Sequence, residues 1–268
     1  MKYVPFLLLP LLMVFQHCSS AEAEDVPSTE ASQERKIVWS DEFSEDQLDT
    51  TVWNYELGDG CPDLCGWGNH ERQLYTKDNH HLADGKLVIT VEKNNDAYTS
   101  TRITTKKKQH FRYGRIEARA KLPVGKGLLP AFWMLGQNID TVNWPACGEI
   151  DVLKYQGHEP GEVSTSLHTQ AGHGVTASTE KAQFSDIEQG FHRYAAEWTP
   201  ENIDFFVDDQ WVHTFEPQDR SVESWPFDKP FYLLLNLAVG GSYGGPEVDD
   251  SVLPQTYIID YVRVYAPE

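Results

Sequence analysis

Short β-rich runs separated by turn residues recur along this chain from about Lys36 onward. Examples are residues 86–92, 114–121, 203–207, 231–237 and 257–265. Asp84-Gly85 and Asp208-Asp209 are turn signals between such runs, and no segment sustains a long helical period. Many strands and few helices predict an all-β sandwich of two sheets, in one domain over residues 36–268.

The N-terminus carries an export pattern. One Lys precedes an apolar run from Phe6 to Phe15, which is too short to span a bilayer, and Cys18 follows shortly after it. We expect residues 1–18 to be a signal peptide with Cys18 as the lipidation site of a bacterial outer-membrane lipoprotein, displayed at the cell surface. Ordinary cleavage nearby is the alternative, because the residues before Cys18 are a poor lipobox. Residues 19–35 are expected to form a flexible acidic tether.

The charge balance excludes two classes of partner. The 268 residues include 41 acidic and 22 basic side chains, a formal net charge of −19. Such a surface repels nucleic acid and anionic lipid, so we expect a neutral ligand, a monomer, and membrane contact only through the lipid anchor. The one basic run, residues 106–108, is interpreted as a solvated turn between strands.

The remaining cysteines have different expected roles. Cys61 and Cys65 are close enough to form a disulfide in an exported protein, although a Cys-x3-Cys pair can also be half of a metal site. Cys147 is expected to be a small buried apolar residue.

An acidic strand is the strongest functional signal in the sequence. In residues 144–155, apolar and acidic positions alternate, which places Glu149 and Asp151 on one face of a sheet. Two adjacent carboxylates are costly unless water, a cation or a sugar offsets their repulsion. A site on this strand is one reading. Structural acids satisfied by neighbouring Arg or backbone groups are the other.

The order and spacing of several motifs carry a resemblance to a known family. These motifs are residues 39–43, 66–71, 113–115, 130–134, 144–151, 166–169, 197–200, 236–241 and 260–265. Over about residues 37–266 the chain resembles glycoside hydrolase family 16, and the laminarinases within it. The resemblance implies a β-jelly roll whose curved sheet holds a β-1,3-linked or mixed-linked glucan chain in an open cleft. It implies no cofactor for catalysis.

The resemblance also implies roles on the acidic strand. The family pattern is Glu-x-Asp-x-x-Glu, with a nucleophile, an assisting Asp and a general acid/base. Glu149 and Asp151 match the first two positions, but the third is Lys154. Lys154 shares their face only if the strand bulges at residues 152–153, and otherwise it points away from the cleft. In the cleft, its ammonium would be held charged by both acids, pair with Glu149 and be a poor proton donor.

The same resemblance implies further ligands. The residues expected to bind sugar are Trp133, Trp144, Asn69, Glu71, Arg115 and His168. Leu129 stands where laminarinases usually carry Trp, so one stacking platform is reduced. A structural calcium is implied at the backbone carbonyls of Glu42 and Gly85 and the carboxylate of Asp260.

Two functional hypotheses follow. The first is an exported, retaining endo-β-1,3-glucanase whose turnover Lys154 impairs. The second is a non-catalytic β-glucan-binding surface lipoprotein that keeps the cleft. A single-base change or sequencing error at position 154 is a third reading, because Glu and Lys codons can differ by one base.

Overall fold

The computed structural model describes residues 1–2 and 35–267. The chain from Arg35 onward forms one compact unit. The predicted signal peptide, Cys18 and nearly all of the predicted tether lie outside the described residues. No helix among the described residues has the length and apolar character needed to cross a membrane.

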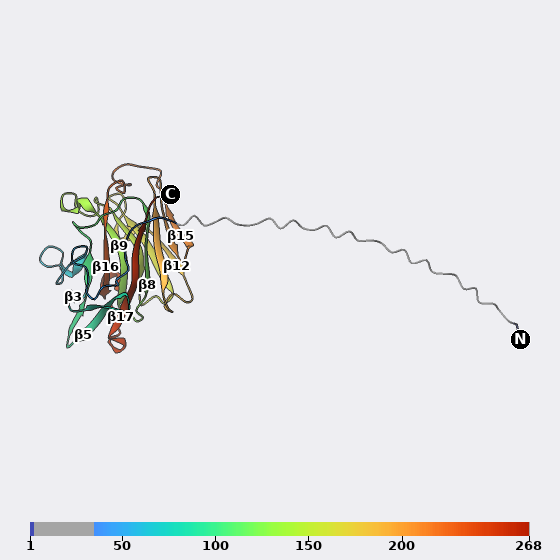
Figure 1. The fold of residues 1–268 in the computed structure, drawn as a ribbon, viewed down its shortest axis with the longest axis horizontal. Coiled ribbons are helices and arrows are strands. Elements are labelled where there is room, and N and C mark those ends of the chain that lie inside the picture. The colour runs from blue at the N-terminus through green and yellow to red at the C-terminus, as the bar shows by residue number, and fades with distance from the viewer. Residues whose placement is uncertain (3–34, 268) are drawn as a thin grey trace. The chain divides into compact units, whose positions relative to one another are not determined.

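Within residues 35–267, the strands form two sheets (Figure 1). The larger sheet has ten strands, with the path β15-β14-β13-β8-β17-β5-β6-β3, and with β1 paired to β17 and β4 paired to β5. Its strands are β1 (Ile37–Asp41), β3 (Gln73–Tyr75), β4 (His80–Ala83), β5 (Lys86–Asn94), β6 (Ala97–Ser100), β8 (Gly114–Lys121), β13 (His192–Trp198), β14 (Ile203–Val207), β15 (Gln210–Phe215) and β17 (Gln255–Tyr265). Neighbours are antiparallel except for β3 and β6.

The smaller sheet has seven strands in the order β12-β11-β10-β9-β16-β7-β2, and its pairs are antiparallel. The strands are β2 (Asn54–Tyr55), β7 (Arg102–Thr104), β9 (Leu128–Gly136), β10 (Glu149–Tyr155), β11 (Glu162–His168), β12 (Ser178–Gln183) and β16 (Phe231–Val239). Strands distant in sequence, such as β7 and β16, therefore lie side by side in this sheet.

Helical structure among the described residues is limited to single turns. These are η1 (Cys65–Gly68), η2 (Gln137–Asp140), η3 (Gly174–Thr176), η4 (Asp250–Val252) and α1 (Gly241–Gly244). A disulfide joins Cys61 to Cys65 at the start of η1, which is one of the two alternatives predicted for this pair. Cys147 is buried and unbonded. The prediction of a two-sheet β-sandwich is confirmed.

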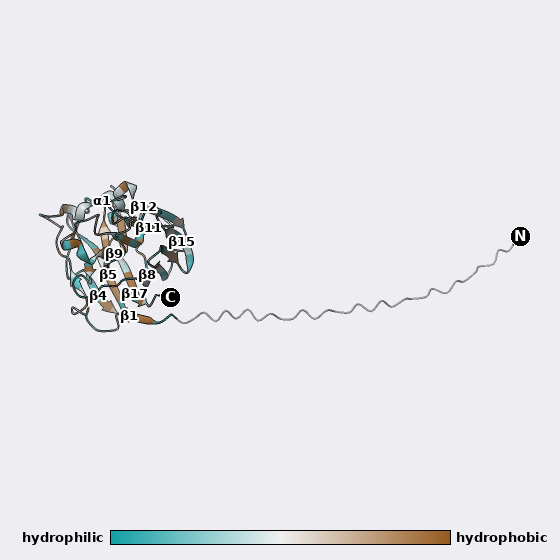
Figure 2. Ribbon diagram, turned by 90° about the horizontal axis from the view of Figure 1, so that it is seen from above, coloured by the Kyte–Doolittle hydropathy of each residue, from teal (hydrophilic) through white to brown (hydrophobic). Residues whose placement is uncertain are grey.

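The hydrophobic core lies between the sheets, and strand alternation decides which side chains enter it. On β9, Phe132 and Met134 are fully buried in the core, so Trp133 between them faces the opposite side of the sheet. On β16, Leu233 and Leu235 are likewise buried in the core, so Asn236 faces the opposite side of the sheet, as Trp133 does. Figure 2 shows the accompanying pattern, with hydrophobic stretches along strands such as β8 and β17 and hydrophilic ones near β4 and β15.

Strand β10 departs from simple alternation at one point. Its register with both β9 and β11 shifts after Asp151, which marks a β-bulge. Val152 and Leu153 are consecutive, yet both are fully buried in the core. Because two successive residues point inward, Lys154 returns to the face that carries Asp151. The bulge that the sequence required for this placement is therefore present.

Candidate active site

The outward face of β10 carries Glu149, which is held by an indole. Trp144 Nε1 donates a 2.8 Å hydrogen bond to Oε2 of Glu149. The Trp144 ring lies against the imidazoles of His168 and His173, with ring centroids 5.8 and 5.3 Å apart, and it remains 44% exposed. Trp144 is therefore not a core residue. It fixes one oxygen of Glu149 while offering an open ring face beside it.

Asp151 and Lys154 form a buried ion pair. The Lys154 ammonium contacts Oδ2 of Asp151, whose side chain is fully buried, and lies 3.9 Å from Oε1 of Glu149. The second distance is too long for a hydrogen bond. Lys154 also lies over the ring of Tyr243, 4.7 Å from its centroid, in a cation–π contact. The ammonium is therefore held chiefly by Asp151 and Tyr243.

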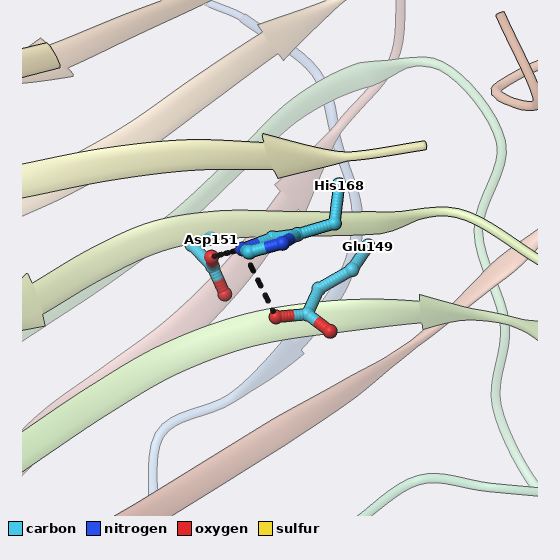
Figure 3. A group of neighbouring side chains, drawn as sticks. All are labelled: Glu149, Asp151 and His168. Carbon is cyan, nitrogen blue, oxygen red and sulfur yellow. Dashed lines mark ion pairs between the residues drawn. The ribbon is translucent and has the colours of Figure 1, made fainter. Parts of the chain in front are cut away.

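His168 closes the group from the neighbouring strand β11 (Figure 3). Its Nε2 lies 3.2 Å from Oδ2 of Asp151 and 3.7 Å from Oε1 of Glu149. The backbone N–H of Gly174 donates to Nδ1, so the neutral ring carries its proton on Nε2. Nε2 thus lies nearer to Asp151 than to Glu149, and His168, predicted to bind sugar, lies beside both carboxylates.

Burial and the neighbouring charges shift the pKa values of Glu149, Asp151 and Lys154, and the balance between the two effects differs from residue to residue. Burial and the neighbouring Asp151 raise the pKa of Glu149 to about 7. Burial also opposes ionisation of Asp151, but Lys154 and His168 outweigh it and lower the pKa of Asp151. Burial opposes the charge on Lys154, but Asp151 and Glu149 outweigh it and raise the pKa of Lys154. At neutral pH the stable state is an Asp151–Lys154 ion pair beside a partly protonated Glu149.

This arrangement limits the chemistry available at the site. A retaining glycosidase needs two carboxyl groups about 5–5.5 Å apart, one as nucleophile and one as acid/base. Glu149 can act as the nucleophile, but the residue opposite it is Lys154. An ammonium with a raised pKa does not release its proton to a leaving group or accept one from water. The site thus provides a nucleophile for the first step of a retaining reaction, the formation of the glycosyl-enzyme, but no acid to protonate the leaving group.

A second cluster on the same face contains stacked cationic and aromatic groups. The guanidinium of Arg102 on β7 lies between two indoles, 4.5 Å from the ring centre of Trp67 and 4.8 Å from that of Trp133. Trp133 Nε1 donates a 2.8 Å hydrogen bond to Oδ1 of Asn236. Trp133 stands directly opposite Asp151 in the pairing of β9 with β10. Its ring therefore lies on the same face as the group formed by Glu149, Asp151, Lys154 and His168.

A hydrogen-bond chain ties the predicted polar residues to Trp133. Asn236 Nδ2 donates to the hydroxyl of Tyr75, and that hydroxyl donates to Oε2 of Glu71. Oε1 of Glu71 accepts a hydrogen bond from the side chain of Asn69. Asn69 and Glu71 thus connect to the cleft face through Tyr75 and Asn236.

Comparison with known proteins agrees with this geometry. The model of the glycosyl hydrolases family 16 matches residues 68–263. The chain belongs to this family. A laminarinase structure from Flavobacterium sp. UMI-01 is 60% identical, with a TM-score of 0.85, and the match covers 86% of this chain and 100% of that one. A β-glucanase of Rhodothermus marinus is 39% identical over 86% of this chain and 85% of its own length.

A third relative has a different printed function. A β-1,3-glucan-binding protein of Penaeus monodon is 28% identical over 87% of this chain and 81% of its own length. As a member of glycoside hydrolase family 16, the chain has the predicted jelly-roll sandwich and is laminarinase-like. The glucanases of this family need no cofactor for catalysis.

The structure corrects the expectation for Arg115. This residue lies on β8 of the larger sheet, whereas the acidic group of this family 16 chain lies on the smaller sheet. Its buried guanidinium is held by Glu117, Glu197 and Asp209, at 2.7–2.9 Å. Arg115 thus neutralises acids on the larger sheet and does not reach the cleft residues. Residues 113–115 resemble a family motif, but the sequence does not show to which sheet they belong, and only the strand order places them in the larger sheet.

The carboxylate predicted as a calcium ligand is paired with basic side chains. Arg119 Nη1 lies 2.5 Å from Oδ2 of Asp260, and Lys86 Nζ lies 3.8 Å from Oδ1. Both carboxylate oxygens therefore face cations, which disfavours a third cation at the same place. The calcium at Glu42, Gly85 and Asp260 stays a prediction, and we assign no chemistry to it.

Several site residues were missed in the sequence. These are Trp67, Tyr75, Arg102, Asn236 and Tyr243. Asn236 could have been found, because it is a polar residue within an otherwise apolar buried strand, Phe231–Val239. Arg102 and Tyr243 carried no local signal, since their contacts join strands and loops far apart in the chain.

Proposed function

We propose that this protein binds β-1,3-glucan in the cleft of the smaller sheet and hydrolyses it slowly, as a family 16 endo-glucanase impaired by Lys154. The observation that carries the proposal is the contact of the Lys154 ammonium with Asp151 on the cleft face. A nucleophile with an oriented carboxylate remains, and the acid/base is replaced by a fixed cation. Loss of a general acid/base typically lowers the rate by about 10²–10⁴-fold.

A second candidate is a non-catalytic β-glucan-binding protein. It is supported by the stable environment of Lys154, which has an ion-pair partner and an aromatic neighbour. The similarity to the β-1,3-glucan-binding protein of Penaeus monodon also supports this candidate. If this second candidate is correct, the exposed ring of Trp144 and the stack of Arg102 with two indoles bind the glucan, and the protein does not hydrolyse it.

The proposal includes a location. An exported monomer anchored through a lipid on Cys18 places the cleft outside the cell, where polysaccharide is met. This part rests on the N-terminal sequence pattern, and its test is fractionation of the wild type beside Cys18→Ala. Recovery of the wild type entirely in soluble fractions would contradict the anchor.

Laminarin binding and hydrolysis by the wild-type chain test the proposed function together. Titration calorimetry measures affinity, and reducing-sugar release measures turnover, each beside Lys154→Glu. We expect binding by both proteins, slow release by the wild type and faster release by the variant. Equal, rapid release by both would contradict impairment by Lys154. Binding without release by either would favour the non-catalytic candidate.

A further inference from the structure

A basic depression lies at the edge of the smaller sheet, away from the catalytic group. It has a volume of about 410 Å³. Its lining consists of Asn54, Tyr55, Glu56, Thr104, Lys106, Lys107 and Lys108. We call this feature the basic pocket. It contains the lysine run that the sequence analysis interpreted as a solvated turn.

The strand register connects the basic pocket to the catalytic group. Asp151 stands opposite Trp133, Trp133 opposite Leu234, Leu234 opposite Thr104, and Thr104 opposite Asn54. Directly opposed residues in a sheet lie on the same face. The row therefore runs over one face from β10 to β2. Four strand spacings of about 4.8 Å put its end roughly 19 Å from Asp151, a span of several sugar rings.

Two of the three lysines of the basic pocket share a single carboxylate. Lys106 Nζ lies 2.6 Å from Oδ1 of Asp140, and Lys107 Nζ lies 2.8 Å from Oδ2. These two ammonium groups hold the pKa of Asp140 at about 2. Each ammonium has three N–H donors, so both keep donor capacity beyond Asp140. Lys108 donates to backbone carbonyls and adds a further positive charge.

Other charged groups around the basic pocket leave it positive. Arg102 pairs with Glu56 at 2.6 Å, Lys77 lies over the ring of Tyr55, and Asp49 interacts with the lysine run. With the three lysines and Asp140, five cations thus face three carboxylates. The chain as a whole carries a formal net charge of −19. A local positive excess on such a protein attracts an anion that the remaining surface repels.

We propose that the basic pocket binds an oxyanion, a sulfate ester or a carboxylate, carried by a glucan chain that occupies the cleft. This inference rests on the proposed function, because the glucan chain brings the anion to the pocket. A neutral glucan forms no ion pair with the two lysines, whereas an anionic substituent several rings from Glu149 meets two ammonium groups. The substrate class is then an anionically substituted β-1,3-glucan.

The test compares neutral, sulfated and carboxylated laminarin by titration calorimetry with the full chain at low salt. We expect the anionic forms to bind about five- to tenfold more tightly than the neutral form, the scale of two exposed ion pairs. In the variant Lys106→Gln/Lys107→Gln this preference disappears, while affinity for neutral laminarin is unchanged. Lys126→Gln is the matched control, because Lys126 is an exposed lysine paired loosely with Glu247, 3.8 Å away. The two anionic probes distinguish sulfate from carboxylate as the source.

Three results would overturn this inference while leaving the proposed function intact. In the first, anionic laminarins bind no more tightly than neutral laminarin. In the second, the preference survives the double variant. In the third, Lys126→Gln removes the preference equally, which would indicate diffuse attraction. If neutral laminarin itself does not bind, the proposed function fails instead.

Discussion

Lys154 pairs with Asp151 and leaves Glu149 outside hydrogen-bond distance. Its ammonium contacts Oδ2 of Asp151, and the nearest oxygen of Glu149 is 3.9 Å away. The sequence pattern predicted that Lys154 pairs with Glu149, and an ion pair at 3.9 Å is present. Asp151 is the closer partner of Lys154, and Oε2 of Glu149 accepts a hydrogen bond from the Trp144 N–H. Position 154 therefore offers no carboxyl group opposite Glu149, while Glu149 keeps an oriented carboxylate.

This relationship predicts that activated glycosides react with the wild-type chain. A 2,4-dinitrophenyl leaving group needs no proton, so Glu149 can displace it from a laminaribioside and form a glycosyl-enzyme. Without a base to activate water, this intermediate should accumulate. We expect a burst of dinitrophenol close to one equivalent, a matching mass increase of the intact protein, and faster turnover with azide. Glu149→Gln is the control and should show no burst. A wild type without a burst would show that Glu149 is not competent.

The burst should depend on pH through Glu149. The pKa of Glu149 is raised to about 7, and only its carboxylate attacks. The burst rate should therefore fall as pH drops below about 7 and level off above it. Lys154→Gln removes a cation that lowers this pKa, so its profile should shift to higher pH. Stopped-flow rates between pH 5 and 9 measure both curves. A midpoint near 4.5 would contradict the raised pKa.

The same carboxylate should destabilise the fold at high pH. The pKa of Glu149 is about 7 in the folded state against an ordinary value of 4.5, so between these values the folded state binds more protons. Its stability contribution is therefore lost as pH rises through this window. Glu149→Gln removes the charge and should raise Tm at pH 8 by about 2–6 °C, for a gain of about 1–2 kcal/mol. At pH 4.5 the two proteins should melt together. Calorimetric scans at both pH values decide this.

Local patterns in the sequence were enough to predict the acidic strand. Alternation placed Glu149 and Asp151 on one face, and the spacing to Lys154 required a bulge that the structure contains. These features depend on residues within one strand. The sandwich class was predictable for the same reason, since strand periods and turn residues repeat along the chain.

Features that join distant segments were not predictable. Arg115 matched a motif, but only the topology shows that β8 belongs to the larger sheet. The Arg102 stack and the Tyr75–Asn236 hydrogen bond bring together segments that are far apart in sequence. The lysine run was interpreted as a solvated turn, and only the register shows that Thr104, shortly before it, lies on the face of Asp151. Sequence periodicity carries no information about such pairings.

Trp144 should contribute to binding through its ring and to chemistry through its N–H. Trp144→Ala should weaken laminarin binding by about 1–3 kcal/mol if the exposed ring stacks on a sugar. Trp144→Phe keeps a ring and removes the hydrogen bond to Glu149, so it should bind nearly normally. With an N–H lost from its carboxylate, Glu149 should show a higher pKa in the burst profile. Unchanged affinity in Trp144→Ala would mean that this ring meets no sugar.

The sharpest prediction concerns position 154. Lys154→Glu restores a carboxyl on the bulged strand, on the face of Glu149, where retaining chemistry needs its acid/base. It also releases Asp151 from its ion pair. We expect laminarin hydrolysis, measured as reducing-sugar release, to rise at least about 10²-fold, the lower end of an acid/base contribution.

Two matched variants separate restored chemistry from the removal of a cation. Lys154→Gln also lacks the ammonium but cannot exchange a proton, so it should stay near the wild-type rate. Adding Glu149→Ala to Lys154→Glu should abolish hydrolysis, because no glycosyl-enzyme can form. If Lys154→Gln gained as much as Lys154→Glu, the defect would lie in the charge of Lys154 and not in the missing acid/base. If the wild type already matched Lys154→Glu, another residue would have to supply the proton.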